Sequence, residues 1–181
     1  EHAHPDQVLF QGEKPFPILP AVDHYAGSEK LMKKALAVQH ELGAVFDITC
    51  DCEDGAHAGA EAEHARMAAS VIMSEDNRFG RVGARIHDIT HSHWEQDVDI
   101  LIGLAGSRLA FLTIPKVRCA ADAARQIESI RSAEERHGIE REIPVHVLIE
   151  THGALREAWE IAALDRVESL DFGLMDFVSG H

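Results

Sequence analysis

Two short apolar runs, Val145-His-Val-Leu-Ile-Glu150 and Leu170-Asp-Phe-Gly173, flank a helix-like segment at residues 155–164. The first run ends in Glu150, and Asp176 lies just past the second, 26 positions later. The order of these three pieces predicts a strand–helix–strand unit. If the two strands are parallel neighbours, their carboxyl ends lie about 5 Å apart in the pairing direction. Both acids then face one crevice at the carboxyl-terminal rim of the sheet.

Glu150 and Asp176 are therefore a candidate metal site. Two hard oxygen ligands, with room for water and substrate, suit Mg²⁺ or Mn²⁺ better than zinc. The alternative is a pair of solvated loop acids, because the chain contains 31 Asp and Glu residues. Spacing alone leaves both interpretations open.

The alternation of apolar runs with helical periodicity extends over the rest of the chain. We expect strands at residues 16–22, 44–50, 81–86, 110–114, 145–149 and 169–172. The helix-like stretches between them lie at residues 28–42, 59–73, 93–104, 120–137 and 155–164. Ser28 is a candidate N-cap for the first helix, and Gly43 and Gly138 are candidate C-terminal stops.

Repeated strand–helix units predict an α/β fold with a parallel sheet and outer helices. Right-handed crossovers leave a doubly wound sheet or a (β/α)₈ barrel. Only six strands can be counted, and a barrel with six of eight strands has two unpaired edges. The chain is thus either an open sheet or a barrel lacking its last strands. We expect residues 1–15 to form an irregular arm and residues 16–181 to form one domain.

Composition excludes several classes of protein. The chain has 181 residues, is 45% hydrophobic and carries a net charge of −14. That charge argues against a nucleic-acid or anionic-membrane surface, which needs basic patches. No apolar run approaches the roughly 18 residues of a membrane span. The three cysteines, Cys50, Cys52 and Cys119, have neither disulfide-framework nor zinc-knuckle spacing, so we expect a cytoplasmic protein.

The acidic cluster Asp51, Glu53 and Asp54 follows the second expected strand. Three carboxylates this close raise at least one pKa and are tolerated best near a cation or a base. Glu53 is expected to reach the metal through a water. Asp51 or Asp54 is expected to pair with Arg85, at the end of the next strand, and to hold its guanidinium in place. The alternative is an acidic N-terminal cap on the following helix.

Arg85 and Lys116 are candidate substrate-binding cations, because each lies at a strand end on the same rim. A guanidinium holds a carboxylate through two hydrogen bonds. The alternative for Arg85 is a structural salt bridge. Lys116 binds a phosphate or carboxylate of the substrate, or pairs with a neighbouring acid. A histidine base would also suit this rim, and the candidates, none preferred, are His57, His87, His91, His93 and His152.

Five motifs at the ends of successive strands resemble those of the citrate lyase β-subunit-like family, within the HpcH/HpaI aldolase group that also holds the malyl-CoA lyases. In order they are Asp51-Cys-Glu-Asp-Gly55, Val82-Gly-Ala-Arg-Ile86, Ile114-Pro-Lys-Val117, Leu148-Ile-Glu-Thr-His-Gly153 and Phe172-Gly-Leu-Met-Asp176. The resemblance covers roughly residues 16 to 181. It implies a (β/α)₈ TIM barrel that lacks its last two strands here, and a homotrimer or homohexamer.

The resemblance also implies a function and a site. Glu150 and Asp176 would be the Mg²⁺ ligands, and Arg85 would bind the substrate carboxylate. Arg85, Glu53 and Asp54 are then the expected catalytic residues of a carbon–carbon lyase. Cleaving or forming a bond next to a carbonyl passes through an enolate, which a divalent ion stabilises. The alternative is a catalytically silent barrel that binds a metabolite or serves in an assembly.

The sequence departs from the family pattern at two positions. Family members often carry an arginine on the first strand, but the run from Pro17 to His24 has none, and Cys52 stands where a larger aliphatic residue is usual. Both departures leave the substrate open, and with it the choice between a coenzyme A thioester and a short keto or hydroxy acid.

Overall fold

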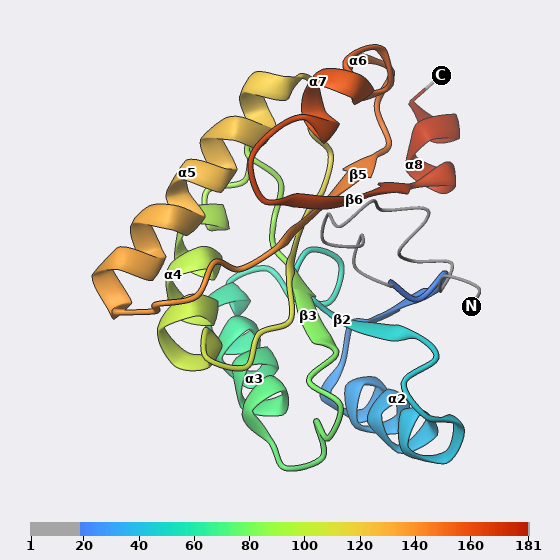
Figure 1. Cartoon of the computed structure of the whole chain (residues 1–181), viewed down its shortest axis with the longest axis vertical. Coiled ribbons are helices and arrows are strands. Elements are labelled where there is room, and N and C mark those ends of the chain that lie inside the picture. The colour runs from blue at the N-terminus through green and yellow to red at the C-terminus, as the bar shows by residue number, and fades with distance from the viewer. Residues whose placement is uncertain (1–18, 181) are drawn as a thin grey trace, which may run out of the picture.

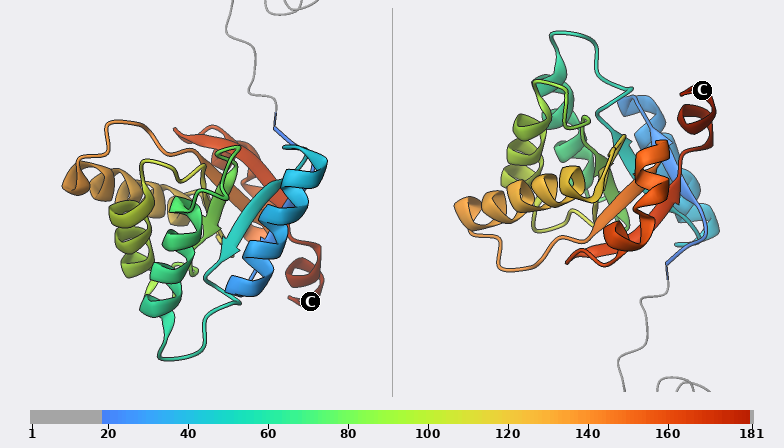
Figure 2. Two further views of the ribbon diagram at one scale, coloured as in Figure 1. Left: turned by 90° about the horizontal axis from the view of Figure 1, so that it is seen from below. Right: turned by 90° about the horizontal axis from the view of Figure 1, so that it is seen from above.

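A computed structural model describes residues 19–180, which form a curled parallel sheet with helices on its outer side (Figures 1 and 2). The strand order is β1-β2-β3-β4-β5-β6. The strands are β1 (Asp23–Ala26), β2 (Asp47–Asp51), β3 (Val82–Arg85), β4 (Leu112–Ile114), β5 (Val145–Ile149) and β6 (Val167–Phe172). The helices are α2 (Glu29–Leu42), α3 (Glu61–Met73), α4 (Trp94–Ala105), α5 (Ala120–His137), α6 (His152–Arg156), α7 (Ala158–Ala162) and α8 (Leu174–Ser179).

The sheet is the part of a (β/α) barrel that the sequence predicts. Every neighbouring pair of strands is parallel, and within residues 19–180 β1 and β6 form no ladder with each other. Within the same range no helix is both long and apolar enough to cross a membrane. The expected arm at residues 1–15 lies outside the described residues.

The ends of α2 and α5 follow from local chemistry that the sequence predicts. The Ser28 hydroxyl accepts a hydrogen bond from the Leu31 N–H at 3.4 Å and so caps α2. Gly43 ends the same helix with φ at +83°. Gly138 ends α5 in the left-handed conformation, at φ +66° and ψ +33°, which glycine adopts at little cost.

Three elements differ from expectation. The first strand is Asp23–Ala26 rather than 16–22; residues 16–18 lie outside the described part, and 19–22 are not a strand. Pro20 lacks the N–H that a sheet ladder requires, so pairing begins after it. The expected helix 155–164 is divided at Glu157, whose carboxylate accepts the Ala120 N–H at 2.8 Å. The short helix α8, which carries Asp176, was not expected.

The two faces of the sheet have different chemistry. On β2, Ile48 and Cys50 point outward and join the apolar core under the helices. The alternate residues Asp47, Thr49 and Asp51 point inward. All five are buried. The inside of the curled sheet therefore holds polar side chains at several depths.

The loop carrying the acidic cluster packs closely against the turn after β1. A Cβ on Gly55 would lie 2.2 Å from the carbonyl oxygen of Asp51 and 2.6 Å from that of Gly27. Both obstacles are backbone atoms, which cannot rotate away. We expect Gly55→Ala to lower the free energy of unfolding by about 1–3 kcal/mol, as overpacking does. Denaturant unfolding measures this change. Gly180→Ala is the control, because its Cβ would meet nothing closer than 3.5 Å; equal stability of the two variants would contradict the prediction.

Candidate metal centre

Glu150 follows the last residue of β5, where its carboxylate is held from two sides. The side chain is buried, and its Oε1 accepts the backbone N–H of Lys116 at 2.7 Å. Lys116 has φ at +49°, an uncommon value for a residue with a side chain, and this conformation accompanies the contact. On the other side, a Cβ on Gly173 would lie 2.5 Å from Oε2. The backbone around Glu150 therefore fixes where its carboxylate lies.

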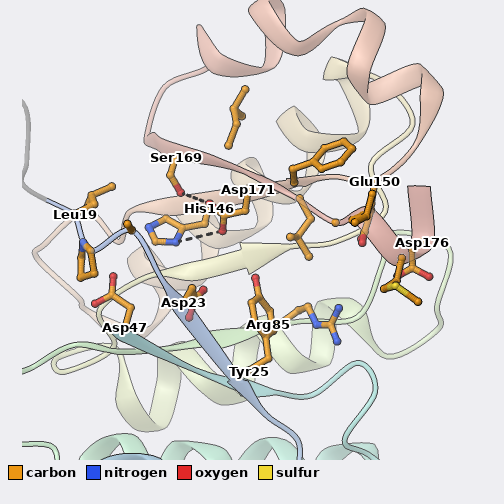
Figure 3. A pocket seen from close by; sticks show the side chains of 18 residues that line it. Leu19, Asp23, Tyr25, Asp47, Arg85, His146, Glu150, Ser169, Asp171 and Asp176 are labelled. Carbon is orange, nitrogen blue, oxygen red and sulfur yellow. Dashed lines mark hydrogen bonds and ion pairs between the residues drawn. The ribbon is translucent and has the colours of Figure 1, made fainter. Parts of the chain in front are cut away.

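Asp176 lies in the first turn of α8 and comes to the same place. Its Oδ2 lies 3.8 Å from the Lys116 Nζ, and its charge raises the pKa of Glu150. Figure 3 shows Glu150 and Asp176 together at one end of the hollow inside the sheet. Asp176 reaches the rim from a helix after β6 rather than from the strand end itself.

Burial raises the pKa of Glu150 to about 7. The Lys116 N–H opposes this rise, while the charges of Glu53 and Asp176 add to it. A cation beside Glu150 would therefore stabilise the ionised form of its carboxyl group.

The raised pKa makes a prediction for stability. The folded-state pKa, about 7, exceeds the ordinary 4.5, so Glu150 stabilises the metal-free fold below pH 4.5, and this contribution is lost as the pH rises toward 7. Relative to Glu150→Gln, which does not titrate, the free energy of unfolding should fall by up to about 1.4 kcal/mol per pH unit within that window. Urea unfolding with a chelator present measures the difference, and a difference that does not vary with pH would contradict it.

Arg85, the last residue of β3, is surrounded by the acidic cluster. Its Nε and Nη2 donate to the two oxygens of Asp51 at 2.9 and 2.6 Å. Its Nη2 also donates to Asp54 at 2.7 Å, and its Nη1 lies 2.8 Å from Glu53 Oε2. The guanidinium also lies 5.1 Å from the centre of the Tyr25 ring. The guanidinium thus pairs with both Asp51 and Asp54, where the sequence predicts a pairing with one of them, and Asp51 occupies one of its two-bond edges.

Lys116 joins the acidic cluster to the metal centre. Its ammonium pairs with Glu53 Oε1 and lies near Asp176. Glu53 therefore bridges the side chains of Arg85 and Lys116, and both cations face acids. The alternative for the acidic cluster, an N-terminal cap on α3, does not hold, because that helix begins only at Glu61 and its N-cap residue is Ala60.

The histidines expected to supply a base lie around the rim rather than in the wall of this hollow; the His152 ring, for instance, lies 4.5 Å from that of Phe177, the residue after Asp176. None of the five candidates lines the hollow that contains Glu150 and Asp176, in the part of the chain that the structure describes. His87, for example, is buried with its Nδ1 2.5 Å from Asp97 Oδ2. His146, which does line the hollow, was not a candidate. Its signal in the sequence is one polar residue inside the apolar run 145–149.

Residues 31–180 match the model of the HpcH/HpaI aldolase/citrate lyase family. The chain belongs to this family. It is 30% identical over 151 residues to an L-malyl-CoA/β-methylmalyl-CoA lyase of Cereibacter sphaeroides, and 27% identical over 135 residues to that of Rhodobacter capsulatus. These alignments cover 81% and 73% of this chain, but 46% and 42% of those proteins. The chain thus spans about half the length of the curated relatives it matches.

Solved structures confirm the barrel fold. A citrate lyase from Burkholderia xenovorans is 54% identical, with a TM-score of 0.86 over 92% of this chain and 52% of that one. Protein CitE of Mycobacterium tuberculosis, solved with magnesium and pyruvate, has a TM-score of 0.63 at 17% identity, over 89% of this chain and 57% of that one. The second likeness concerns the fold alone. The predicted family and the predicted partial (β/α) barrel are both confirmed.

Proposed function

We propose that this chain carries the metal-binding part of a Mg²⁺-dependent carbon–carbon lyase. The substrate would be a short keto or hydroxy acid or its coenzyme A thioester. The observation that carries the proposal is the convergence of Glu150 and Asp176 at the rim, with Glu150 fixed by the Lys116 N–H. Membership of a family of aldolases and lyases supports the same reaction class.

The charges at the rim fit a divalent cation. Five carboxylates gather there, and the side chains of Arg85 and Lys116 supply only two positive charges. The carboxylates are those of Asp51, Glu53, Asp54, Glu150 and Asp176. Carboxylate oxygens are the ligands that Mg²⁺ and Mn²⁺ prefer. Glu150 and Asp176 would hold the ion, which when bound supplies a Lewis acid for the charge developing on a carbonyl oxygen.

Arg85 and Lys116 would position the substrate carboxylate. Of the five N–H donors of a guanidinium, the three on Nε and Nη2 of Arg85 are used in hydrogen bonds to Asp51 and Asp54. Nη1 lies 2.8 Å from Glu53 Oε2 but, among the described residues, forms no hydrogen bond with it, so Nη1 is the donor left for the substrate. The Lys116 ammonium lies between Glu53 and Asp176 and offers a second donor. Glu53 and Asp54 would keep both cations charged and in place during the reaction.

The names of the relatives support the proposed substrate class. Malyl-CoA lyases act on thioesters, whereas M. tuberculosis proteins of the same fold were solved with pyruvate or oxaloacetate and magnesium. Pyruvate and oxaloacetate place a keto carbonyl beside a carboxylate, whereas malyl-CoA carries a hydroxyl group in that place. We also propose a homotrimer or homohexamer, as the family resemblance of the sequence implies. The three free cysteines support a cytoplasmic location.

A cleavage assay tests the proposed function. Malyl-CoA, β-methylmalyl-CoA and the corresponding free hydroxy acids would be incubated with the protein and Mg²⁺, and the released carbonyl product would be measured. We expect cleavage of at least one substrate, its loss with a chelator, and its return with Mg²⁺ or Mn²⁺. Binding of these molecules without turnover under all conditions would instead support the silent metabolite-binding barrel.

A further inference from the structure

The inside of the curled sheet contains a second group of potential metal ligands. Asp23 begins β1, His146 lies in β5 and Asp171 lies in β6. One ligand atom from each side chain lies within 4.8 Å of the others, and Figure 3 shows the three side chains converging. Glu150 lies four residues further along the chain than His146, which is roughly 13 Å at the rise of a strand. The group is therefore separate from the candidate metal centre at the rim.

His146 presents one ring nitrogen to this group and uses the other elsewhere. The side chain is 4% exposed, and its ring stacks on Phe111 with centroids 3.9 Å apart. Its Nε2 lies 3.1 Å from Glu168 Oε2. Its Nδ1 is buried and, among residues 19–180, has no hydrogen-bond partner. Metal-binding histidines have this arrangement, with a carboxylate on the second nitrogen that orients the ring.

The two acids are also held by neighbours. Both oxygens of Asp23 accept the Thr49 hydroxyl, at 2.8 and 2.7 Å. Asp171 Oδ1 accepts the Ser169 hydroxyl at 3.0 Å. Asp171 Oδ2 is buried without a hydrogen bond within the described residues and lies 3.9 Å from His146 Nδ1. This distance is too long for a hydrogen bond and suits two ligands of one ion.

Burial makes this arrangement costly without a cation. His146 is buried and the two acids are half-buried, and the polar atoms that lie inside a protein are almost always hydrogen-bonded or bound to a cation. Here the His146 Nδ1 and the Asp171 Oδ2 face each other at 3.9 Å, and neither forms a hydrogen bond within the described residues. A cation between these two atoms would be coordinated by both of them. It would also neutralise the negative charge of Asp23 and Asp171.

We propose that Asp23, His146 and Asp171 bind a divalent transition-metal ion inside the barrel. One imidazole nitrogen with two carboxylates suits ions that accept both ligand types, such as Mn²⁺ and Zn²⁺, rather than Mg²⁺. The ion connects β1 with β5 and β6, and β1 and β6 share no backbone ladder in the described part of the chain. Such an ion would stabilise the fold, because a ligand that binds only the folded state raises the free energy of unfolding.

Electron spin-echo spectroscopy with Mn²⁺ tests the site, because it detects an imidazole nitrogen bound to the ion. Glu150→Gln removes the rim centre and should retain Mn²⁺ with nitrogen coupling. His146→Gln should lose that coupling, and Asp171→Asn should weaken the same binding at least tenfold. His57→Gln, at an exposed histidine, is the control and should retain the nitrogen coupling. Thermal unfolding of each variant without metal checks that it folds.

The outcomes separate this site from the proposed function. Nitrogen coupling that survives in His146→Gln, or that disappears equally in His57→Gln, would overturn the interior site. So would the loss of all Mn²⁺ binding in Glu150→Gln, a result that supports the rim centre. If the interior site is confirmed but the protein shows no lyase activity, the interior metal site is supported and the proposed lyase function is contradicted.

Discussion

Replacing Glu150 with Gln should abolish Mg²⁺ binding at the rim and lower lyase activity by at least about 10²-fold, the effect of losing one charge-stabilising group. The two side chains have nearly the same shape, so the Lys116 N–H and the contact with Gly173 can persist. What is lost is the negative charge and one strong oxygen ligand. Only Asp176 then remains of the proposed pair.

Calorimetric titration with Mg²⁺ measures the binding, and the cleavage assay measures the activity. Glu160→Gln is the matched control, because Glu160 is an exposed residue of α7 that contributes nothing to the rim. The control should keep full affinity and full activity. Equal Mg²⁺ affinity in the wild type and in Glu150→Gln would contradict the proposal that Glu150 binds the metal at the rim.

The sequence predicts the order of strands and helices because that order follows from local periodicity. Helix α5 begins and ends where the pattern places it, at Ala120 and His137. The start of β1 cannot be read from local periodicity in the same way. Residues 16–22 are apolar and strand-like in sequence, but the first residue of the strand depends on where β2 pairs with it. The Asp47 N–H donates to the Val22 carbonyl, just before the ladder.

The site is predictable only in part. Strand-end spacing brings Glu150 and Asp176 to one rim, and carboxylates beside Arg85 suggest pairing. Which acids pair with Arg85 depends on the loop around Gly55, which no periodicity describes. The interior group was missed for another reason. His146 and Asp171 lie on different strands, and their proximity depends on strand register and on the curl of the sheet.

Replacing Arg85 with Lys should lower kcat/KM more than roughly tenfold, about 1.4 kcal/mol of transition-state stabilisation. Lysine keeps the charge, but one ammonium cannot reproduce the planar contacts to Asp51, Glu53 and Asp54. The proton proposed for the substrate carboxylate is lost at the same time. Mg²⁺ affinity should change little, because no hydrogen bond or ion pair joins Arg85 to Glu150 or Asp176 among residues 19–180.

A buried arginine can also matter only for folding, and the chain offers a matched control for that alternative. Arg81 forms the same two-bond contact with Asp47, at 2.5 and 3.0 Å, and the two residues are also 34 positions apart. It lies four residues before Arg85, roughly 13 Å away toward the other end of the strand. Arg81→Lys should therefore lower the melting temperature without lowering kcat/KM. If both variants lost activity in proportion to stability, Arg85 would be a structural residue; a selective loss in Arg85→Lys would place its guanidinium at the substrate.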